Sequence, residues 1–488
     1  MADKIRWAGY PSAVVFAEPD GKKAVQHLLW GDWLRLKTGR RNGFAEVHAR
    51  GCDGWMREEE VQEERLLELI FVDIGQGDGC LVVTPKDQVM VIDAGDGDNM
   101  FRFLRWRFGK FSKPFAFHAA VISHPDSDHY YGFDRLFDEP NASFGTLYHN
   151  GILERAGKDS LGPKTTTGRP RFLQELVRDT AELRAFLADE SRWKGKRYPT
   201  MLAKGLGNGS FAEAQALSVE DGHLPGFGPD RELSIEILGP VREQGRLRWL
   251  SSVGKTKNGH SVVLKLVYRD VRVLLGGDLN IPSEELLLEH HTGLSMPPKS
   301  PAEYDTIVEA ARRVFEVDVA KACHHGSSDF SSLYLEATNP IATVVSSGDD
   351  EPHAHPRADA LGTMGRHSRG DRPLIFSTEL SRSTKENVKQ PNVLRSELKR
   401  LRKEIEEHPT ATKADRRRKE RLQKSFDALV DTIDRSVAVY GAINVRTDGR
   451  RVVLAQKLER PRSKGKKWDI YRIEPQGDGG PLRFVSKH

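Results

Sequence analysis

Short apolar runs, separated by turn residues, fill about the first sixty positions of the chain. The runs AVVFAE, VQHLLW and WLRLK alternate with turn sequences such as PDGK and GRRNG. Strands of this length at this spacing are typical of a small all-β unit. We therefore predict a small β-barrel over residues 1–63.

From residue 66 onward the apolar runs are longer and end in Gly, Asp or Ser. LLELIFVDIG, QVMVIDAG and HAAVISHP have the pattern of buried strands, and HSVVLKLVYRDVRVLLGGD has that of two strands joined at YRD. VDVAKACHHGSS and IATVVSSGDD add one strand each, while FLQELVRDTAELRAFLADE and PSEELLLEHH have helical spacing. Residues 64–488 are thus predicted to form an α/β domain in which strand ends place side chains along one rim.

Two inserts interrupt this domain. Residues 150–235 are rich in Gly, Pro and basic residues and are predicted to be mostly loop. Residues 390–436 are predicted to form a helical hairpin, broken at EHPTATKAD, whose polar face is basic in KRLRK and DRRRKERLQK. A basic face of this kind could bind a nucleic-acid backbone. Alternatively the hairpin is simply solvated, since KEIEE adds glutamates to it. The apolar positions at helical spacing are Leu394, Leu398, Leu401, Ile405, Leu422, Phe426, Leu429 and Ile433.

Composition narrows the class of protein. With 488 residues, 30% charged and 38% hydrophobic, the chain fits a globular protein of two or three domains. Its net charge of +5 is only mildly basic. No run is long and apolar enough for a bilayer, and MADKIRWAGYPSAVVF lacks a secretory layout. Because Cys52, Cys80 and Cys323 are few and far apart, we predict a cytoplasmic protein without disulfides and without a membrane partner.

The stretch SHPDSDH carries the most informative chemistry, because His124, Asp126, Asp128 and His129 fall within six positions. Carboxylates packed this tightly repel one another unless a cation lies between them. A mixture of imidazole and carboxylate groups suits zinc, manganese or iron better than magnesium or calcium. The other candidate ligands, at the ends of later predicted strands, are Asp278 in LLGGD and the pair His324 and His325 in ACHHGSS.

HPDSDH resembles the HxHxDH motif of the metallo-β-lactamase fold. The order FVDIGQGDG, VIDAG, SHPDSDHYYG, NGHSVVLKL, VLLGGD, HHGSSDFS and HAHP resembles the hydrolase domain of the ComEC/Rec2 DNA-uptake proteins, over roughly residues 66–460. The resemblance implies an αββα sandwich, with the basic hairpin inserted before its closing strands. GDWLRLK followed by GWMREEEVQ resembles bacterial Src-homology-3-like modules, which implies either a protein- or peptide-binding role or an appendage packed on the main domain.

The same resemblance implies two divalent metal ions, zinc or manganese. It assigns His124 and Asp126 to the first ion, Asp128 and His129 to the second, and Asp278 to both. His325 is our choice for the remaining ligand of the second ion, which leaves His324 to face the substrate.

Two features depart from the family pattern. Asp126 stands where a histidine is usual, which favours manganese at the first ion. Before the SVVL strand the family pattern N-x-x-S matches Asn258 and Ser261, so the first ion either uses His260, the nearest histidine, or is held loosely, with Asn258 as a candidate orienting group. The positions where the family places groups that orient the ligands, or where a turn is merely capped, are Asp73 and Asp93.

Two metals with a bridging hydroxide would suit phosphodiester cleavage, so a phosphodiesterase or nuclease is the predicted function. The chain has no G-x-S-x-G turn and no P-loop, which argues against a serine hydrolase and a P-loop enzyme. A small-molecule hydrolase (of a cyclic nucleotide, a phosphocholine ester or a lactone) and a non-catalytic scaffold remain as alternatives. The candidate catalytic residues are Asp128, His324 and His355, of which His355 would be a general acid or a phosphate contact. The candidate substrate contacts are Ser327, Ser328, Arg416, Arg417 and Arg418.

Overall fold

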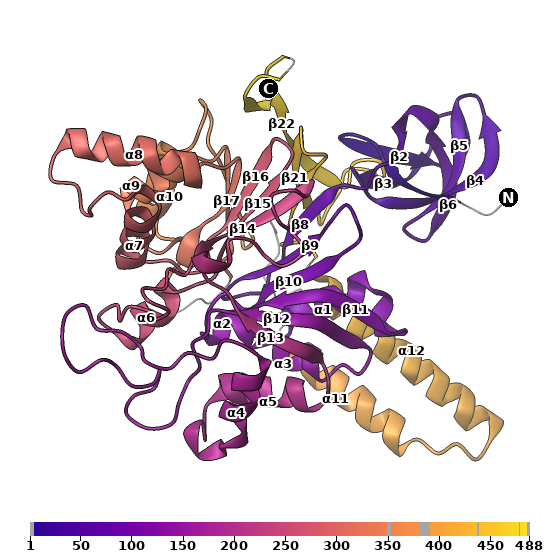
Figure 1. Cartoon of the computed structure of the whole chain (residues 1–488). Coiled ribbons are helices and arrows are strands. Elements are labelled where there is room, and N and C mark those ends of the chain that lie inside the picture. The colour runs from indigo at the N-terminus through magenta and orange to yellow at the C-terminus, as the bar shows by residue number, and fades with distance from the viewer. Residues whose placement is uncertain (1–3, 349–352, 381–390, 437–438, 478, 486–488) are drawn as a thin grey trace.

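The computed structural model describes residues 4–348, 353–380, 391–436, 439–477 and 479–485 (Figure 1). Within these ranges the chain forms three β-sheets, of seven, ten and six strands. The seven-stranded sheet makes up an N-terminal module, and the other two sheets form the main domain. Among the helices in these ranges, none combines the length and the apolar character that a membrane span requires.

The N-terminal module is a single antiparallel sheet in the order β3-β2-β6-β5-β4-β1-β7. Asn42 and Gly43 form the two-residue turn predicted at GRRNG, with φ angles of 52° and 75° that suit an Asn-Gly hairpin turn. The predicted barrel is wrong in one respect: β3 and β7 lie at opposite ends of the sheet, so the barrel is not closed. The strands are β1 (Lys4–Ala8), β2 (Ser12–Phe16), β3 (Ala24–Leu29), β4 (Trp33–Arg41), β5 (Phe44–Ala49), β6 (Cys52–Arg57) and β7 (Val61–Gln62).

The ten-stranded sheet has the order β13-β12-β11-β10-β9-β8-β20-β21-β22-β23. Strands β10 to β13 run parallel, and the remaining neighbours pair antiparallel. Because β20 pairs with β8, the strands from β20 to β23 extend the sheet that begins with the first strands of the main domain. The strands are β8 (Leu67–Phe71), β9 (Gly79–Val83), β10 (Val89–Ala94), β11 (Phe115–Val121), β12 (Ala142–His149), β13 (Phe211–Ala216), β20 (Ile443–Thr447), β21 (Val452–Lys457), β22 (Trp468–Pro475) and β23 (Leu482–Val485).

The six-stranded sheet has the order β14-β15-β16-β17-β18-β19. Its first two pairings are antiparallel, and the turn at Arg269 and Asp270 joins β15 to β16 as the sequence predicts. The later strands pair parallel. The strands are β14 (Leu233–Gly239), β15 (Val263–Tyr268), β16 (Val271–Leu275), β17 (Val319–Lys321), β18 (Ala342–Val345) and β19 (Leu374–Ser377).

The two sheets of the main domain pack face to face, and helices cover both outer faces (Figure 1). Strand β8 shows why: Leu69 and Phe71 face the core between the sheets, whereas Ile70 and Val72, with the opposite parity, face the helices. This is the αββα arrangement implied by the family resemblance. The covering helices are α1 (Asn99–Arg107), α3 (Gly132–Phe137), α4 (Thr180–Ala188) and α5 (Arg197–Gly207) on one side, and α7 (Ile281–Thr292), α8 (Pro301–Phe315), α9 (Ser332–Thr338) and α10 (Ala358–Arg366) on the other.

The insert at 150–235 is more regular than predicted, because it supplies α4, α5 and β13. Residues up to 179 do form a loop with only isolated bridges, such as Lys164 with Leu173. The predicted helix over FLQELVRDTAELRAFLADE begins late, at Thr180, since the Asp179 side chain caps it by accepting from Glu182 N at 2.9 Å.

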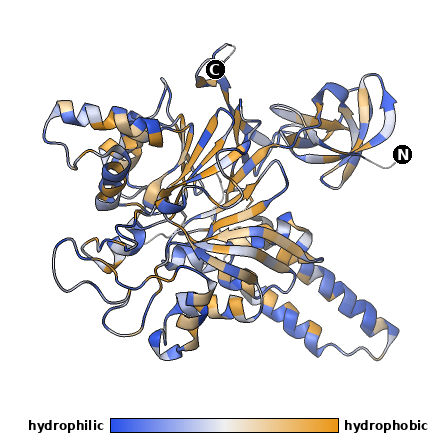
Figure 2. Cartoon of the chain, in the orientation of Figure 1, coloured by the Kyte–Doolittle hydropathy of each residue, from blue (hydrophilic) through white to orange (hydrophobic). Residues whose placement is uncertain are grey.

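The basic insert forms two helices, α11 (Pro391–Glu407) and α12 (Lys413–Ser436), which project from the body next to α1 (Figure 1). Thr412 caps α12 by accepting from Asp415 N at 3.1 Å. Leu401 on α11 is buried, and the exposed faces of the hairpin are strongly hydrophilic (Figure 2). The predicted apolar positions Leu398, Ile405, Leu422, Phe426 and Leu429 are half-buried, whereas the side chains of Leu394 and Ile433 lie outside the described part of the chain.

The N-terminal module packs on β21 and β22 of the main domain. Trp30 is fully buried in an apolar cluster with Leu66 and Val453. Beside this cluster the buried Arg446 reaches Asp32 at 2.9 Å and Glu68 at 2.6 Å. This packing is what the appendage interpretation of the module requires, and partner binding by the module stays a prediction.

Candidate metal centre

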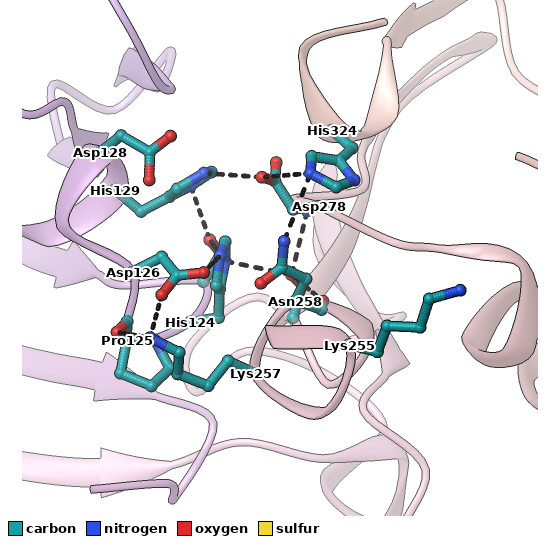
Figure 3. Close-up of polar contacts among 12 residues, drawn as sticks. His124, Pro125, Asp126, Asp128, His129, Lys255, Lys257, Asn258, Asp278 and His324 are labelled. Carbon is teal, nitrogen blue, oxygen red and sulfur yellow. Dashed lines mark hydrogen bonds and ion pairs between the residues drawn. The ribbon is translucent and has the colours of Figure 1, made fainter. Parts of the chain in front are cut away.

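A cluster of buried imidazole and carboxylate groups lies where strands of both main-domain sheets end (Figure 3). The segment after β11 supplies His124 and His129, the turn after β16 supplies Asp278, and the 3-10 helix after β17 supplies His325. Each of these four side chains is at most 3% exposed. Segments that are far apart in the sequence therefore meet at one rim.

The loop after β8 presses against the turn that carries His129. Gly77 has a φ angle of 103°, and a Cβ there would lie 1.7 Å from the backbone oxygen of Asp128, so the close approach requires glycine. Asp78 N donates to the same oxygen at 3.1 Å. The contact brings the Asp78 side chain into the cluster together with α2 (Ser127–Tyr130).

The Nε2 atoms of two histidines converge on one carboxylate. His129 Nε2 lies 3.2 Å and His325 Nε2 lies 3.1 Å from Asp278 Oδ2. Asp128 Oδ2 lies 3.5 Å from His325 Nε2. Among the described residues, both Nε2 atoms and Asp278 Oδ1 are buried without a hydrogen-bond partner. Buried polar atoms are seldom left so, and the donor set of imidazole and carboxylate fits a divalent cation of the zinc or manganese type.

The opposite ring nitrogens are held by the surrounding protein. His129 Nδ1 lies 2.8 Å from Asp93 Oδ2, and Asp93 also accepts from Ser123 N at 2.8 Å. His325 Nδ1 lies 3.2 Å from both Ser346 O and Asp78 Oδ1. Partners on Nδ1 leave Nε2 free to face a metal, which is how groups outside a metal site orient its ligands.

Asp78 and Lys321 were missed by sequence reasoning. The ammonium of Lys321 contacts Asp78, donates to Gly277 O at 2.9 Å and lies 3.6 Å from Asp278 Oδ1. Burial alone would lower the pKa of Lys321, but the carboxylates of Asp78 and Asp278 raise it above its usual value. Asp78 stands in the GQGDG turn, a Gly/Asp signal that could have marked it, whereas a lysine within VDVAKACHH carries no such signal.

His124 and Asp126 lie beside this cluster. His124 Nε2 lies 3.6 Å from Asp126 Oδ2, and His124 Nδ1 lies 3.1 Å from Ser123 Oγ and 3.3 Å from Ser261 Oγ. Burial alone would raise the pKa of Asp126, but His124 and the ammonium of Lys257 lower it to about 2. Asp126 is therefore an ionised, already partnered carboxylate.

The prediction that His260 is a ligand is not met by the structure. Its Nε2 lies 2.6 Å from Arg248 O, and burial lowers the pKa of this imidazole to about 4. Asn258 and Ser261, the residues that match the N-x-x-S pattern, do border the centre: Asn258 lies between Asp126 and His324, and Ser261 Oγ accepts from Asp278 N at 3.0 Å.

Asp73 also differs from the metal-orienting role given to it. Its Oδ1 accepts from Gly75 N at 3.3 Å, and its carboxylate packs against Gly441, where a Cβ would lie 2.1 Å from Oδ2. This is the turn-capping alternative. The carboxylates that contact the Nδ1 atoms of His129 and His325 are those of Asp93 and Asp78.

The remaining candidates line the exposed side of the centre. His324 Nε2 lies 4.0 Å from Asp278 Oδ2, farther than that of His325, and its ring centroid lies 5.6 Å from that of His355. Ser327 Oγ accepts from Asp329 N at 3.2 Å. Ser328 Oγ, in contrast, donates to the Asp359 carboxylate, and the candidates Arg416, Arg417 and Arg418 are exposed on α12, outside the centre.

Glu284 on α7 is a buried carboxyl group close to the 3-10 helix that carries His325. Its Oε2 accepts from Ser331 N at 2.5 Å, and burial raises its pKa to about 8 from an ordinary 4.5. Between pH 4.5 and 8 the unfolded chain loses this proton and the folded chain keeps it, so stability falls as the pH rises. The titratable groups around it are Asp329, Glu285, Cys323 and Tyr334.

We expect Glu284→Gln to remove this pH-dependent loss of stability. Relative to the wild type, the variant should gain stability between pH 5 and pH 8.5, by on the order of 4 kcal/mol at the upper end. Thermal unfolding at both pH values, with EDTA present to equalise metal content, measures the gain. Glu309→Gln, at an exposed site on α8, is the control, and equal shifts for both variants would contradict the assignment.

Comparison with known protein families supports the site. No curated protein matches the chain. The family model of the metallo-beta-lactamase superfamily matches residues 79–326, slightly more than half of the chain. That range runs from β9 to the 3-10 helix after β17 and so contains His129, Asp278 and His325. The chain therefore belongs to the metallo-beta-lactamase superfamily.

Proposed function

We propose that this protein is a metal-dependent phosphodiesterase whose substrate is a nucleic acid. The observation that carries the proposal is the convergence of the buried Nε2 atoms of His129 and His325 on the Asp278 carboxylate, all within 3.2 Å. With Asp128, these residues would hold the cation. A divalent cation in that place would supply positive charge to a phosphoryl oxygen and would acidify water.

The exposed side of the centre offers groups for the rest of the reaction. His324 and His355 lie side by side there, and an imidazole can hand a proton to a leaving alkoxide oxygen. The hydroxyl of Ser327 is within the same turn as His324 and can donate to a phosphate oxygen. These roles stay part of the proposal.

Nucleic acid is favoured over a small molecule by charge and by resemblance. The hairpin exposes many cations on α11 and α12, which suits a phosphate backbone. The motif order, from FVDIGQGDG to HAHP, resembles the hydrolase domain of DNA-uptake proteins of the ComEC/Rec2 family, which supports a DNA substrate.

The deciding experiment measures metal content and hydrolysis on one preparation. The purified protein is assayed with added manganese or zinc on bis(p-nitrophenyl) phosphate and on labelled single- and double-stranded DNA. Bound metal with cleavage of DNA supports the proposal. Bound metal with cleavage of the small phosphodiester alone would replace nucleic acid by a small molecule, and absence of metal and of cleavage would refute a hydrolytic role.

The hairpin's role can be tested by charge reversal. We expect replacement of Arg416, Arg417 and Arg418 by glutamate to weaken DNA binding and to reduce the slope of log K against log salt by about 2, because fewer counterions are released. Fluorescence anisotropy over a salt series measures this slope.

A control must change the net charge equally elsewhere. Lys299, Arg313 and Arg483 are exposed cations outside the hairpin. Their reversal should leave the salt slope close to that of the wild type. Equal slopes for the two triple variants would mean that the hairpin is only a solvated surface.

A further inference from the structure

We infer that the Lys257 ammonium supplies the positive charge beside Asp126 in place of one of the two metal ions, so that the centre binds a single divalent cation held by Asp128, His129, Asp278 and His325. The inference rests on the proposed function but concerns the number of ions rather than the reaction. It replaces the sequence-based expectation of two ions. The centre has two halves, one around Asp278 and one around Asp126. The contacts in the two halves differ, and this difference supports the inference.

One half is a complete ligand set. His129 and His325 present Nε2 atoms without hydrogen-bond partners among the described residues, and Asp278 lies within 3.2 Å of both. Their Nδ1 atoms are held by Asp93 and by Ser346 O. Among the described residues, the one group of possible ligands whose atoms all lie within 4.8 Å of one another is in this half and consists of Asp78, His129, Asp278 and His325.

In the other half a lysine already forms an ion pair with the carboxylate of Asp126. Lys257 Nζ contacts Asp126 Oδ1 (Figure 3), lies 3.3 Å from Pro125 O and lies 3.6 Å from Glu154 Oε1. The Lys257 side chain is only 13% exposed. An ammonium held by three oxygens at this burial is a fixed positive charge beside Asp126, the carboxylate that the family resemblance assigns to the first ion.

The second oxygen of Asp126 is also partnered. With its amide nitrogen turned toward Gly254 and Asp126, Asn258 donates to Gly254 O at 2.9 Å and to Asp126 Oδ2 at 2.7 Å. Both carboxylate oxygens are thus bound by protein cations or amides. An ion bound to Asp126 would have to share a carboxylate whose charge Lys257 already balances.

Among the described residues, the one imidazole in contact with Asp126 is that of His124, whereas His324 lies on the far side of Asn258. His124 contributes one Nε2 without a hydrogen-bond partner among the described residues, whereas His260 is turned toward Arg248 O. Catalytic zinc sites commonly take three protein ligands. With Asp278 facing His129, His325 and Lys321, this half offers one free imidazole and one neutralised carboxylate. That falls short of three ligands, so we expect no tightly bound ion there.

The test counts ions and does not depend on activity. Native mass spectrometry and elemental analysis of the full chain, loaded with excess manganese or zinc and then desalted, should give one ion per chain. Electron paramagnetic resonance of the manganese form should show an uncoupled ion. Two ions per chain, or a spin-coupled pair, would overturn the inference.

Variants that free Asp126 should gain a second ion. Lys257→Met combined with Asn258→His frees Asp126 and restores an imidazole, so the double variant should bind two ions. Lys255→Met changes the neighbouring half-buried lysine of α6 (Val253–Gly259), which pairs with Asp329 and not with Asp126, and should keep one ion. A folded double variant, judged by circular dichroism, that still binds one ion would contradict the assigned role of Lys257.

The outcomes separate this inference from the proposed function. A wild type that binds two ions and cleaves DNA would leave the function standing and remove the role of Lys257. A wild type that binds one ion without cleaving any phosphodiester would do the reverse.

Discussion

Replacing Asp278 by alanine is expected to abolish hydrolysis, with turnover reduced by about 1,000-fold or more. The Asp278 carboxylate lies 3.2 Å from His129 Nε2, 3.1 Å from His325 Nε2 and 3.6 Å from Lys321 Nζ. Its removal leaves two imidazoles without a shared anionic ligand and a buried ammonium with one carboxylate fewer. The variant should therefore lose bound metal as well as activity.

Turnover and metal content of Asp278→Ala are measured on the same sample, with thermal unfolding to show that the fold persists. Asp270→Ala, at the exposed turn between β15 and β16, is the matched control and should retain both properties. Asp128→Ala should also lose activity, since Asp128 lies 3.5 Å from His325 Nε2. Full turnover in Asp278→Ala would mean that the chemistry takes place elsewhere.

Much of this centre could be predicted because its groups are local in sequence or stand at strand ends. Four candidates occur within SHPDSDH, and Asp278 and His325 each follow an apolar run that forms a strand. Strand ends that share a rim bring such groups together whatever the rest of the fold does.

The choice between neighbouring residues could not be made from sequence. Asp73 and Asp78 stand in the same turn, and only the packing of Gly441 on Asp73 and of Gly77 on Asp128 decides which carboxylate reaches the cluster. Both contacts join segments that are distant in the chain. A sequence pattern contains no information on them.

The ligand before β15 was left open for a related reason. Asn258 and Ser261 are three positions apart at the end of α6 and so share one side, toward the centre. His260 lies between them and points to Arg248 O. The direction of each side chain depends on where it falls in the last turn of α6. That position is hard to predict where a short helix ends at a glycine, as in KNGHS.

Barrel closure was predicted wrongly because it depends on two edges. Turn residues and apolar alternation specify each strand and each hairpin of the N-terminal module. Whether β3 then pairs with β7 depends on the twist of the whole sheet. The structure leaves these edges apart, and the module is held instead by contacts with the main domain.

Those contacts predict the largest effect on stability. The side chain of Arg446 is 2% exposed and joins the module to the main domain: it donates to Trp30 O at 2.6 Å, reaches Asp32 Oδ1 at 2.9 Å and reaches Glu68 Oε2 at 2.6 Å. Burial alone would raise the pKa of Asp32, but Arg50 and Arg446 hold it below its usual value. The network is thus a set of buried charges that satisfy one another.

We expect Arg446→Ala to lower the free energy of unfolding by about 3–5 kcal/mol, because it leaves Asp32 and Glu68 buried with one cation fewer each. Urea unfolding followed by tryptophan fluorescence measures the loss, and limited proteolysis shows whether the module detaches first. Arg450→Ala, at an exposed position four residues along, should change stability by less than about 0.5 kcal/mol. If Arg446→Ala were equally harmless, the apolar contacts of Trp30 alone would be sufficient to hold the module, because the ion network would then contribute nothing to its attachment.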